Sequence, residues 1–169
     1  MTDPPEKAFD RFVEPLDPPL VILTTVHDGE RSGCIVGFHT QCSIEPRRYA
    51  IWLSKTNHTF GVALHAEHFA VHVVDEAQRE LAELFGGTTG DEIDKFESCA
   101  WTPGPGGVPL LDDLPDRLVG RRVAWLDDGS DHACITLDPV QVDDAPAEAV
   151  VRASALAHLT PGHDADEPT

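Results

Sequence analysis

Residues 20–39 decide the fold and read Leu-Val-Ile-Leu-Thr-Thr-Val-His-Asp-Gly-Glu-Arg-Ser-Gly-Cys-Ile-Val-Gly-Phe-His. The first seven residues are aliphatic or β-branched, which is typical of a buried strand. Asp28-Gly29 then separates two apolar runs, and this dipeptide is a strong signal for a tight hairpin. The stretch therefore predicts two antiparallel strands, at 20–26 and 33–39.

The rest of the chain repeats this strand-and-turn pattern. Strands are predicted at 49–53, 69–74, 118–126 and 132–142, short helices at 60–67 and 75–85, and a loop at 102–107. Near the N-terminus, Phe9, Phe12 and Val13 predict a short amphipathic turn that packs on the body. Six or seven mainly antiparallel strands with short helices favour a small closed barrel of the α+β class. We expect one domain over residues 1–160 and a disordered acidic tail over 161–169.

Charge excludes several kinds of partner. The chain has 169 residues, of which 30 are Asp or Glu and 12 are Lys or Arg, so its formal charge is −18. Nucleic-acid backbones and anionic membranes are bound mainly through Lys and Arg, so we expect neither as a partner. A small anionic ligand held in one local pocket stays compatible with this charge.

The cysteines and the N-terminal residues indicate which kinds of site to expect and where in the cell the protein is expected. The cysteines at 34, 42, 99 and 134 form no Cys-x-x-Cys pair, which disfavours a zinc site or a disulfide framework. The start of the chain lacks the features of a secretion signal, so we expect a cytoplasmic protein. The phosphate-loop, dinucleotide-binding and nucleophile-elbow motifs are all absent from the sequence. The histidines at 65, 68 and 72 favour structural or surface roles over metal ligation.

Residues 54–60, Ser-Lys-Thr-Asn-His-Thr-Phe, join a strand end to a helix start. Hydroxyls, one ammonium and free backbone N–H groups at a helix N-terminus can hold an anion such as a phosphate. The alternative is helix capping by Asn57 or Thr59. Lys55 favours the anion site, because the chain has only three lysines.

Two further features suggest a ligand site. Residues 37–43, Gly-Phe-His-Thr-Gln-Cys-Ser, leave a strand and can lie along a flat heteroaromatic ring, although an ordinary polar strand end explains them as well. His132 follows Asp131 at a hairpin, where side chains often point into a site on a barrel rim, although a lone turn histidine is the simpler interpretation.

Taken together, these segments resemble the flavin reductase family with an FMN-binding split barrel, over residues 9–143. The resemblance rests on residues in family order, among them Ser43-Ile44-Glu45-Pro46, Ile51-Trp52-Leu53-Ser54-Lys55-Thr56, Asp94-Lys95-Phe96 and Asp131-His132.

The resemblance implies a homodimeric split barrel with flavin near the subunit interface. FMN, or FAD, would be the cofactor, NADH or NADPH the co-substrate, and a monooxygenase a possible partner. His132 would lie where the nicotinamide arrives and is the candidate catalytic residue. No metal is implied. The candidate cofactor-binding residues are Gly37, Phe38, His39, Thr40, Gln41, Cys42 and Ser43 along the flavin ring, Ser54, Lys55, Thr56, Asn57 and Thr59 around its phosphate, and Phe85 beside it.

Departures from the family pattern leave alternatives open. They lie at Gly37, at Gln41-Cys42, at Arg47-Arg48 and at His72. The protein could instead hold its flavin tightly and serve another redox substrate, or bind flavin without catalysis. Because flavin phosphate and nicotinamide cofactors are anions, we expect a chain of charge −18 to bind them through local donors, in residues 54–59 or at Arg47 and Arg48.

Overall fold

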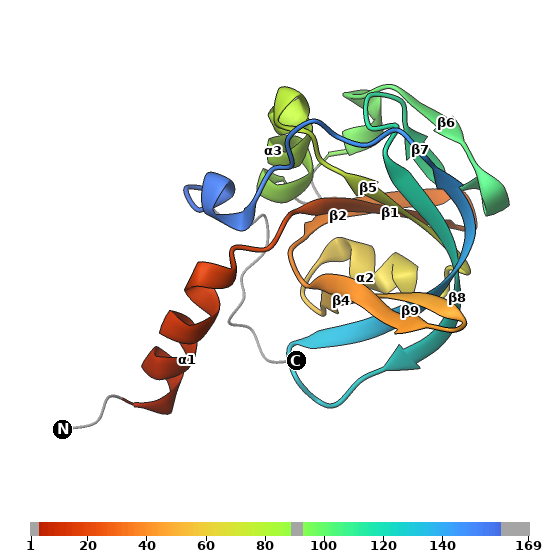
Figure 1. The fold of residues 1–169 in the computed structure, drawn as a ribbon. Coiled ribbons are helices and arrows are strands. Elements are labelled where there is room, and N and C mark those ends of the chain that lie inside the picture. The colour runs from red at the N-terminus through yellow and green to blue at the C-terminus, as the bar shows by residue number, and fades with distance from the viewer. Residues whose placement is uncertain (1–3, 89–92, 160–169) are drawn as a thin grey trace.

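The computed structural model of the chain describes residues 4–88 and 93–159. Seven strands form one antiparallel sheet in the order β2-β1-β5-β8-β9-β4-β3, and β6 and β7 form a small hairpin beside it (Figure 1). The strands are β1 (Val21–His27), β2 (Glu30–Val36), β3 (His39–Ile44), β4 (Arg47–Ser54), β5 (His68–Val73), β6 (Trp101–Pro103), β7 (Pro109–Leu111), β8 (Arg117–Leu126) and β9 (His132–Asp143).

Short helices complete the fold. Figure 1 places α2 in the barrel mouth, α3 beside the outer face of the sheet, and α1 away from the body. The α-helices are α1 (Pro5–Val13), α2 (His58–Ala63) and α3 (Arg79–Gly87), and the 3-10 turns are η1 (Glu14–Leu16), η2 (Glu76–Gln78), η3 (Lys95–Glu97), η4 (Pro105–Gly107) and η5 (Ala153–Leu156). Within the described residues, no helix is long and apolar enough to cross a membrane.

The predicted Asp-Gly hairpin joins β1 to β2. Asp28 and Gly29 both have positive φ, +48° and +83°, which is the conformation that a two-residue hairpin turn requires. The two edge strands of the sheet, β2 and β3, follow each other in the chain, yet no ladder joins them along their described residues. The sheet curls into a barrel that stays open between β2 and β3, so the predicted full closure was wrong.

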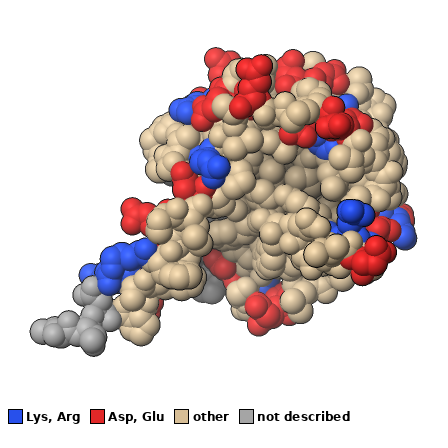
Figure 2. All heavy atoms as spheres, viewed as in Figure 1, with Lys and Arg blue, Asp and Glu red and all other residues tan. Residues whose placement is uncertain are grey.

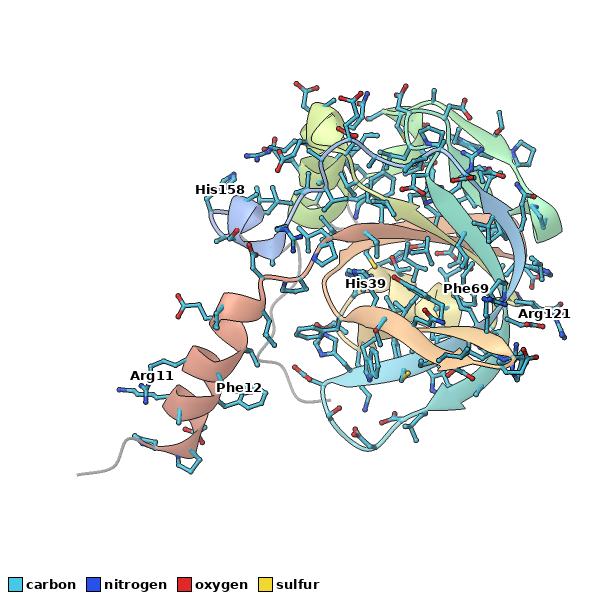
Figure 3. The ribbon with its side chains drawn as sticks, viewed as in Figure 1. Arg11, Phe12, His39, Phe69, Arg121 and His158 are labelled. Atoms are coloured by element: carbon cyan, nitrogen blue, oxygen red, sulfur yellow. The ribbon has the colours of Figure 1, made fainter. Side chains whose placement is uncertain are left out.

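Strand β1 begins with three aliphatic residues, and its first five residues are buried, so both of its faces are covered there. Val21 and Leu23 share one core cluster with Phe69 of β5. Figure 3 shows Phe69 inside the barrel. Ile22 points to a second core between the sheet and α3, which also holds Phe85. Side chains that alternate across a strand therefore supply two cores at once.

Helix α3 approaches β2 closely. A Cβ placed on Gly33 would lie 2.8 Å from Phe85 Cε1 and 2.9 Å from the carbonyl oxygen of Leu23. Glycine at this position lets the Phe85 ring pack directly on the strand. The helix predicted at 75–85 is in fact the turn η2, capped by the side chain of Asp75, followed by α3.

Three other predictions differ from the structure. Residues 39–44 form the edge strand β3 rather than a segment that leaves the sheet. Residues 102 and 103, at the start of the predicted loop, belong to β6 and pair with β7. The N-terminal turn is a full helix, α1, which lies away from the barrel (Figure 1), and the side chains of Phe9 and Phe12 on it are exposed rather than packed on the body. The tail predicted at 161–169 lies outside the described residues.

Candidate functional site

A pocket opens where the chain leaves the sheet at the end of β2. It has a volume of about 180 Å³ and lies between the end of β2, the end of β4 and the start of β9. The backbone N–H of Trp52 donates to the carbonyl of Phe38 at 2.9 Å, which fixes the connection between β2 and β3 against β4. We call this the His132 pocket; its lining residues are Cys34, Ile35, Val36, Gly37, Phe38, Trp52, Leu53, Ser54, Asn57, Asp131 and His132.

His132 is held on two sides. Its ring lies beside that of Phe38, with centroids 5.2 Å apart, and its Nδ1 is 2.8 Å from Oδ1 of Asp131. The contact with His132 also lowers the pKa of Asp131 below its ordinary value, so this carboxylate stays charged beside the imidazole. Ser54 is the cross-strand partner of His132 in the β4–β9 ladder. The pairing of β4 with β9 thus brings Ser54, the first residue of the predicted segment 54–60, next to His132.

The segment after β4 performs the predicted helix capping. The side chain of Asn57 accepts a hydrogen bond from the backbone N–H of Thr59 at 2.9 Å, which caps α2. Thr59 itself is buried, and its hydroxyl lies 2.9 Å from that of Ser32. Ser54 Oγ and Thr56 Oγ1 lie 3.0 Å apart and are partly exposed. Asn57 and Thr59 therefore have structural partners, whereas Ser54 and Thr56 keep hydroxyls near the surface.

Lys55 is bound by the turn between β8 and β9. Its Nζ donates to Oδ1 of Asp127 at 2.6 Å, and its backbone N–H donates to the carbonyl of Asp131 at 2.9 Å. The hydrogen bond from Lys55 is the main reason that the pKa of Asp127 lies below its ordinary value. The only lysine predicted to hold an anion thus already has an anionic partner.

The other predicted residues lie apart from the His132 pocket. His39 bonds to the hydroxyl of Tyr49 and to the carbonyl of Pro19. Thr40, Gln41, Cys42 and Ser43 continue along β3, with Thr40, Gln41 and Cys42 exposed. Phe85 does not line the pocket; it is buried in the second core, where its ring packs against that of Phe96. Of the segment 37–43, the structure brings only Gly37 and Phe38 to the pocket.

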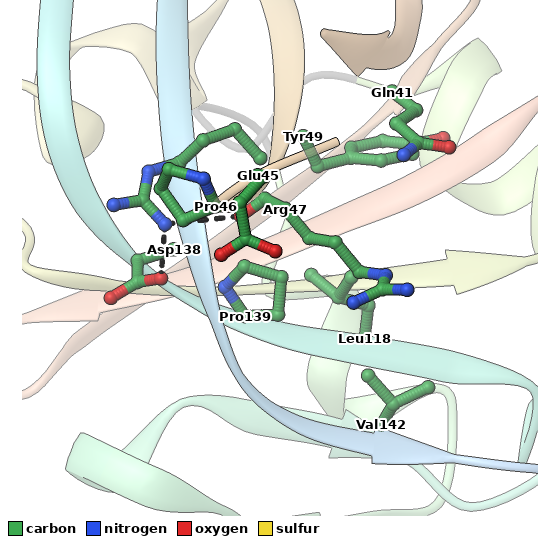
Figure 4. A pocket seen from close by; sticks show the side chains of 10 residues that line it. Gln41, Glu45, Pro46, Arg47, Tyr49, Leu118, Asp138, Pro139 and Val142 are labelled. Atoms are coloured by element: carbon green, nitrogen blue, oxygen red, sulfur yellow. Dashed lines mark hydrogen bonds and ion pairs between the residues drawn. The ribbon is translucent and has the colours of Figure 1, made fainter. Parts of the chain in front are cut away.

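A second pocket lies at the opposite end of the β3–β4 hairpin. Figure 4 shows Arg47, Leu118 and Pro139 around it, with Arg48 donating to Asp138 at 2.5 Å. Gln41 faces this pocket, whose volume is about 490 Å³. Arg47 and Arg48 are therefore placed away from the His132 pocket, which does not include them.

Sequence reasoning missed several residues of the His132 pocket. Trp52 precedes Ser54 by two positions on β4, and Cys34 precedes Val36 by two positions on β2. Side chains two positions apart on a strand share a face. Because side chains alternate between the two faces of β4, a site that includes Ser54 is also expected to include Trp52.

The side chains of the His132 pocket are suited to binding and orienting a ligand rather than to nucleophilic attack on it. Burial raises the pKa of the Cys34 thiol to about 11, so it is protonated at neutral pH and is a poor nucleophile. In the described part of the chain, no three His, Cys, Asp or Glu side chains gather closely enough to hold a metal ion. What remains is an aromatic wall, an imidazole with a carboxylate, and hydroxyls at the rim.

Comparison with known proteins shows the family of the chain. The model of the family described as the flavin reductase like domain matches residues 16–157. The reductase subunit HsaB of a flavin-dependent monooxygenase from Mycobacterium tuberculosis is 26% identical over 128 residues, which cover 76% of this chain and 66% of the relative. The FMN reductase (NADH) RutF 2 from Rhizobium rhizogenes is 29% identical over 125 residues, which cover 72% of this chain and 69% of the relative.

The fold is shared with solved structures. A flavin reductase domain protein from an Arthrobacter species superposes with a TM-score of 0.73 at 21% identity, over 87% of this chain and 94% of that one. This likeness confirms the predicted antiparallel split barrel.

Proposed function

Because the chain belongs to the flavin reductase like domain family, we propose that it is an NAD(P)H-dependent reductase of FMN. The observation that carries the proposal is the His132 pocket. Gly37-Phe38, Ser54 and His132 come from three separate parts of the chain, each predicted to serve a flavin site, and they line one pocket. Relatives named as NADH-dependent FMN reductase and as a monooxygenase reductase subunit support the same activity.

The donor set fits a flavin. Phe38 and Trp52 offer aromatic surface for a flat ring, and the pocket is of a size to take part of an isoalloxazine. Ser54 lines the pocket, its hydroxyl lies 3.0 Å from that of Thr56, and Lys55 is the next residue in the chain. Two hydroxyls and an ammonium in this segment suit the phosphate at the other end of FMN. Asn57 both lines the pocket and caps α2, whereas Thr59 serves this site indirectly, through the start of α2.

When bound, the flavin supplies hydride acceptance at its N5 from the reduced nicotinamide. The chain's own residues bind and orient the two partners. His132, with Nδ1 oriented by Asp131, stands at the rim and is the candidate to contact the nicotinamide. A protein nucleophile is not required, which agrees with the protonated Cys34.

The test is NADH and NADPH oxidation by the purified chain with and without added FMN. The proposal expects oxidation that depends on FMN with at least one nicotinamide. A protein that binds FMN tightly but oxidises neither nicotinamide would point to another redox substrate. Failure to bind FMN or FAD at micromolar concentration would contradict a flavin function altogether.

We also propose a homodimer that works with a flavin-dependent monooxygenase. The relative in Mycobacterium tuberculosis is a reductase subunit of such an enzyme, which supports this class of partner. Light scattering that gives the mass of one chain would contradict the dimer. Supply of reduced FMN to a purified flavin-dependent monooxygenase, followed by product formation, would test the pairing.

A further inference from the structure

We propose that Asp127 competes with the phosphate of the flavin for Lys55, so that this carboxylate sets how strongly the site prefers a phosphorylated flavin. The inference rests on the proposed flavin site, and it assigns to Asp127, in the β8–β9 turn, control over the preference of that site for a phosphorylated flavin. The two side chains are 72 positions apart in the chain, and the ladder between β4 and β9 brings them together.

The geometry of Asp127 is that of a competitor already in place. Its Oδ1 accepts from Lys55 Nζ at 2.6 Å and from the backbone N–H of Gly129 at 2.9 Å. The second bond belongs to the turn itself, so the carboxylate stays near Lys55 without depending on it. A phosphate that binds Lys55 must displace this carboxylate or share the ammonium with it.

The surroundings of Lys55 strengthen the competition. Asp128 and Asp131 also interact electrostatically with Lys55, so three carboxylates of one turn act on a single ammonium. The remaining lysines are no substitute, since Lys7 lies on the exposed helix α1 and Lys95 is buried in the second core. A dianionic phosphate therefore meets a neutralised lysine inside an acidic rim.

The ion pair is accessible to a ligand. The side chains of Lys55 and Asp127 are 29% and 44% exposed. Exposed pairs of this kind contribute little to the stability of a fold. Breaking the pair thus changes ligand binding more than it changes folding, which makes the inference testable with folded variants.

The experiment compares FMN with riboflavin, which has the same ring but no phosphate, by quenching of flavin fluorescence. Asp127→Asn keeps an oxygen for the Gly129 N–H but removes the charge. We expect FMN to bind about five-fold more tightly and riboflavin to bind unchanged, as suits the loss of one exposed ionic competitor. Asp128→Asn is the matched control in the same turn, and its gain for FMN should be smaller because its carboxylate makes no hydrogen bond to Lys55.

A double-mutant cycle isolates the role of Lys55. In a Lys55→Met background, Asp127→Asn should no longer improve FMN binding beyond the general effect seen for Asp128→Asn. Equal FMN affinity of the wild type and Asp127→Asn would overturn this inference alone, since FMN still binds. If the wild type binds neither FMN nor riboflavin, the proposed function fails and the inference with it.

Discussion

The ring of Phe38 lies beside the imidazole of His132, with centroids 5.2 Å apart and planes inclined by 59°. One ring comes from the connection between β2 and β3, and the other from the first residue of β9. Both residues line the His132 pocket. Phe38 is 60% exposed, so the contact contributes a surface for a ligand rather than part of the core.

Replacing Phe38 by alanine should therefore weaken FMN binding without unfolding the protein. We expect the dissociation constant to rise about five- to ten-fold, since an aromatic contact of this kind contributes about 1 kcal/mol. The free energy of unfolding should change by less than about 0.5 kcal/mol. Phe12→Ala is the matched control, because Phe12 is 68% exposed on α1 and should affect neither quantity. An unchanged FMN affinity in Phe38→Ala would remove this ring from the site.

His132 should affect the nicotinamide step more than flavin binding. We expect His132→Gln to lower kcat/KM for the nicotinamide about ten-fold, which is about 1.4 kcal/mol of transition-state stabilisation, while FMN affinity changes less than about two-fold. Steady-state kinetics and fluorescence titration measure the two effects separately. His158→Gln, a change in an exposed residue near the described C-terminal end (Figure 3), is the control. Equal losses in both quantities would place His132 on the flavin instead.

The sequence predicted most of the strands because their residues are apolar on one or both faces. β3 escaped prediction because it is a polar edge strand: four of its six residues, among them Gln41 and Cys42, are exposed, so its pattern resembles that of a loop. What defines it is pairing with β4, which depends on a neighbour rather than on its own composition. Edge strands are the elements whose sequence carries the least information about burial.

The candidate site was predictable in part for a similar reason. Ser54 and His132 were identified from local patterns, and the sheet places them opposite each other. The partner of Lys55 was not predictable, because Asp127 belongs to a different hairpin. The sequence also contains many other acidic residues that could pair with a lysine. On the face that Figure 2 shows, many of the Asp and Glu side chains gather over the end that carries α3 and the β6–β7 hairpin, with smaller groups elsewhere.

Lys95 is a buried lysine whose hydrogen bonds should stabilise the fold. Its buried Nζ donates to the carbonyls of Gly33 at 3.2 Å and Phe85 at 3.0 Å, which ties the 93–98 segment to β2 and α3. Lys95→Met leaves two buried carbonyls without this donor, so we expect the free energy of unfolding to fall by about 2 kcal/mol. Urea denaturation measures it, with Lys7→Met on α1 as the control. A Lys95→Met protein as stable as the wild type would mean that burying the ammonium costs as much as its bonds contribute.

His72 should make stability depend on pH. The ring is buried, its Nδ1 lies 3.1 Å from the carbonyl of Ile22, and its Nε2 accepts from the N–H of Leu111. This arrangement requires the neutral ring, and burial lowers the pKa of His72 to about 4, with Arg117 and Asp143 acting as smaller, opposed influences. Between its ordinary pKa near 6.5 and pH 4, the unfolded chain binds the proton and the folded chain does not.

The free energy of unfolding should therefore be independent of this group above pH 6.5 and fall as the pH drops towards 4, by roughly 3 kcal/mol in all. Urea denaturation at several pH values between 7.5 and 4.5 measures the slope. His72→Gln cannot titrate, so it should start less stable at pH 7 and lose less on acidification. Parallel curves for the two proteins would show that another group causes the pH dependence.

Net charge leads to the last prediction, on the rate of flavin association. A chain of charge −18 repels the phosphate of FMN at long range, and Lys55, which we propose to hold that phosphate, is already paired with Asp127. Salt shortens the Debye length from about 30 Å at 0.01 M to about 8 Å at 0.15 M, which screens the repulsion. We expect the association rate constant of FMN, measured by stopped-flow fluorescence, to rise about two- to five-fold over this range.

Riboflavin is the control for this rate, because it carries no phosphate and should associate equally fast at both salt concentrations. A rate constant for FMN that falls with salt would mean that local attraction by Lys55 outweighs the field of the whole chain. In Asp127→Asn the lysine is released from its partner, so its attraction opposes the repulsion and the rise with salt should be smaller than in the wild type. The size of that difference separates the local charge at the pocket from the charge of the molecule.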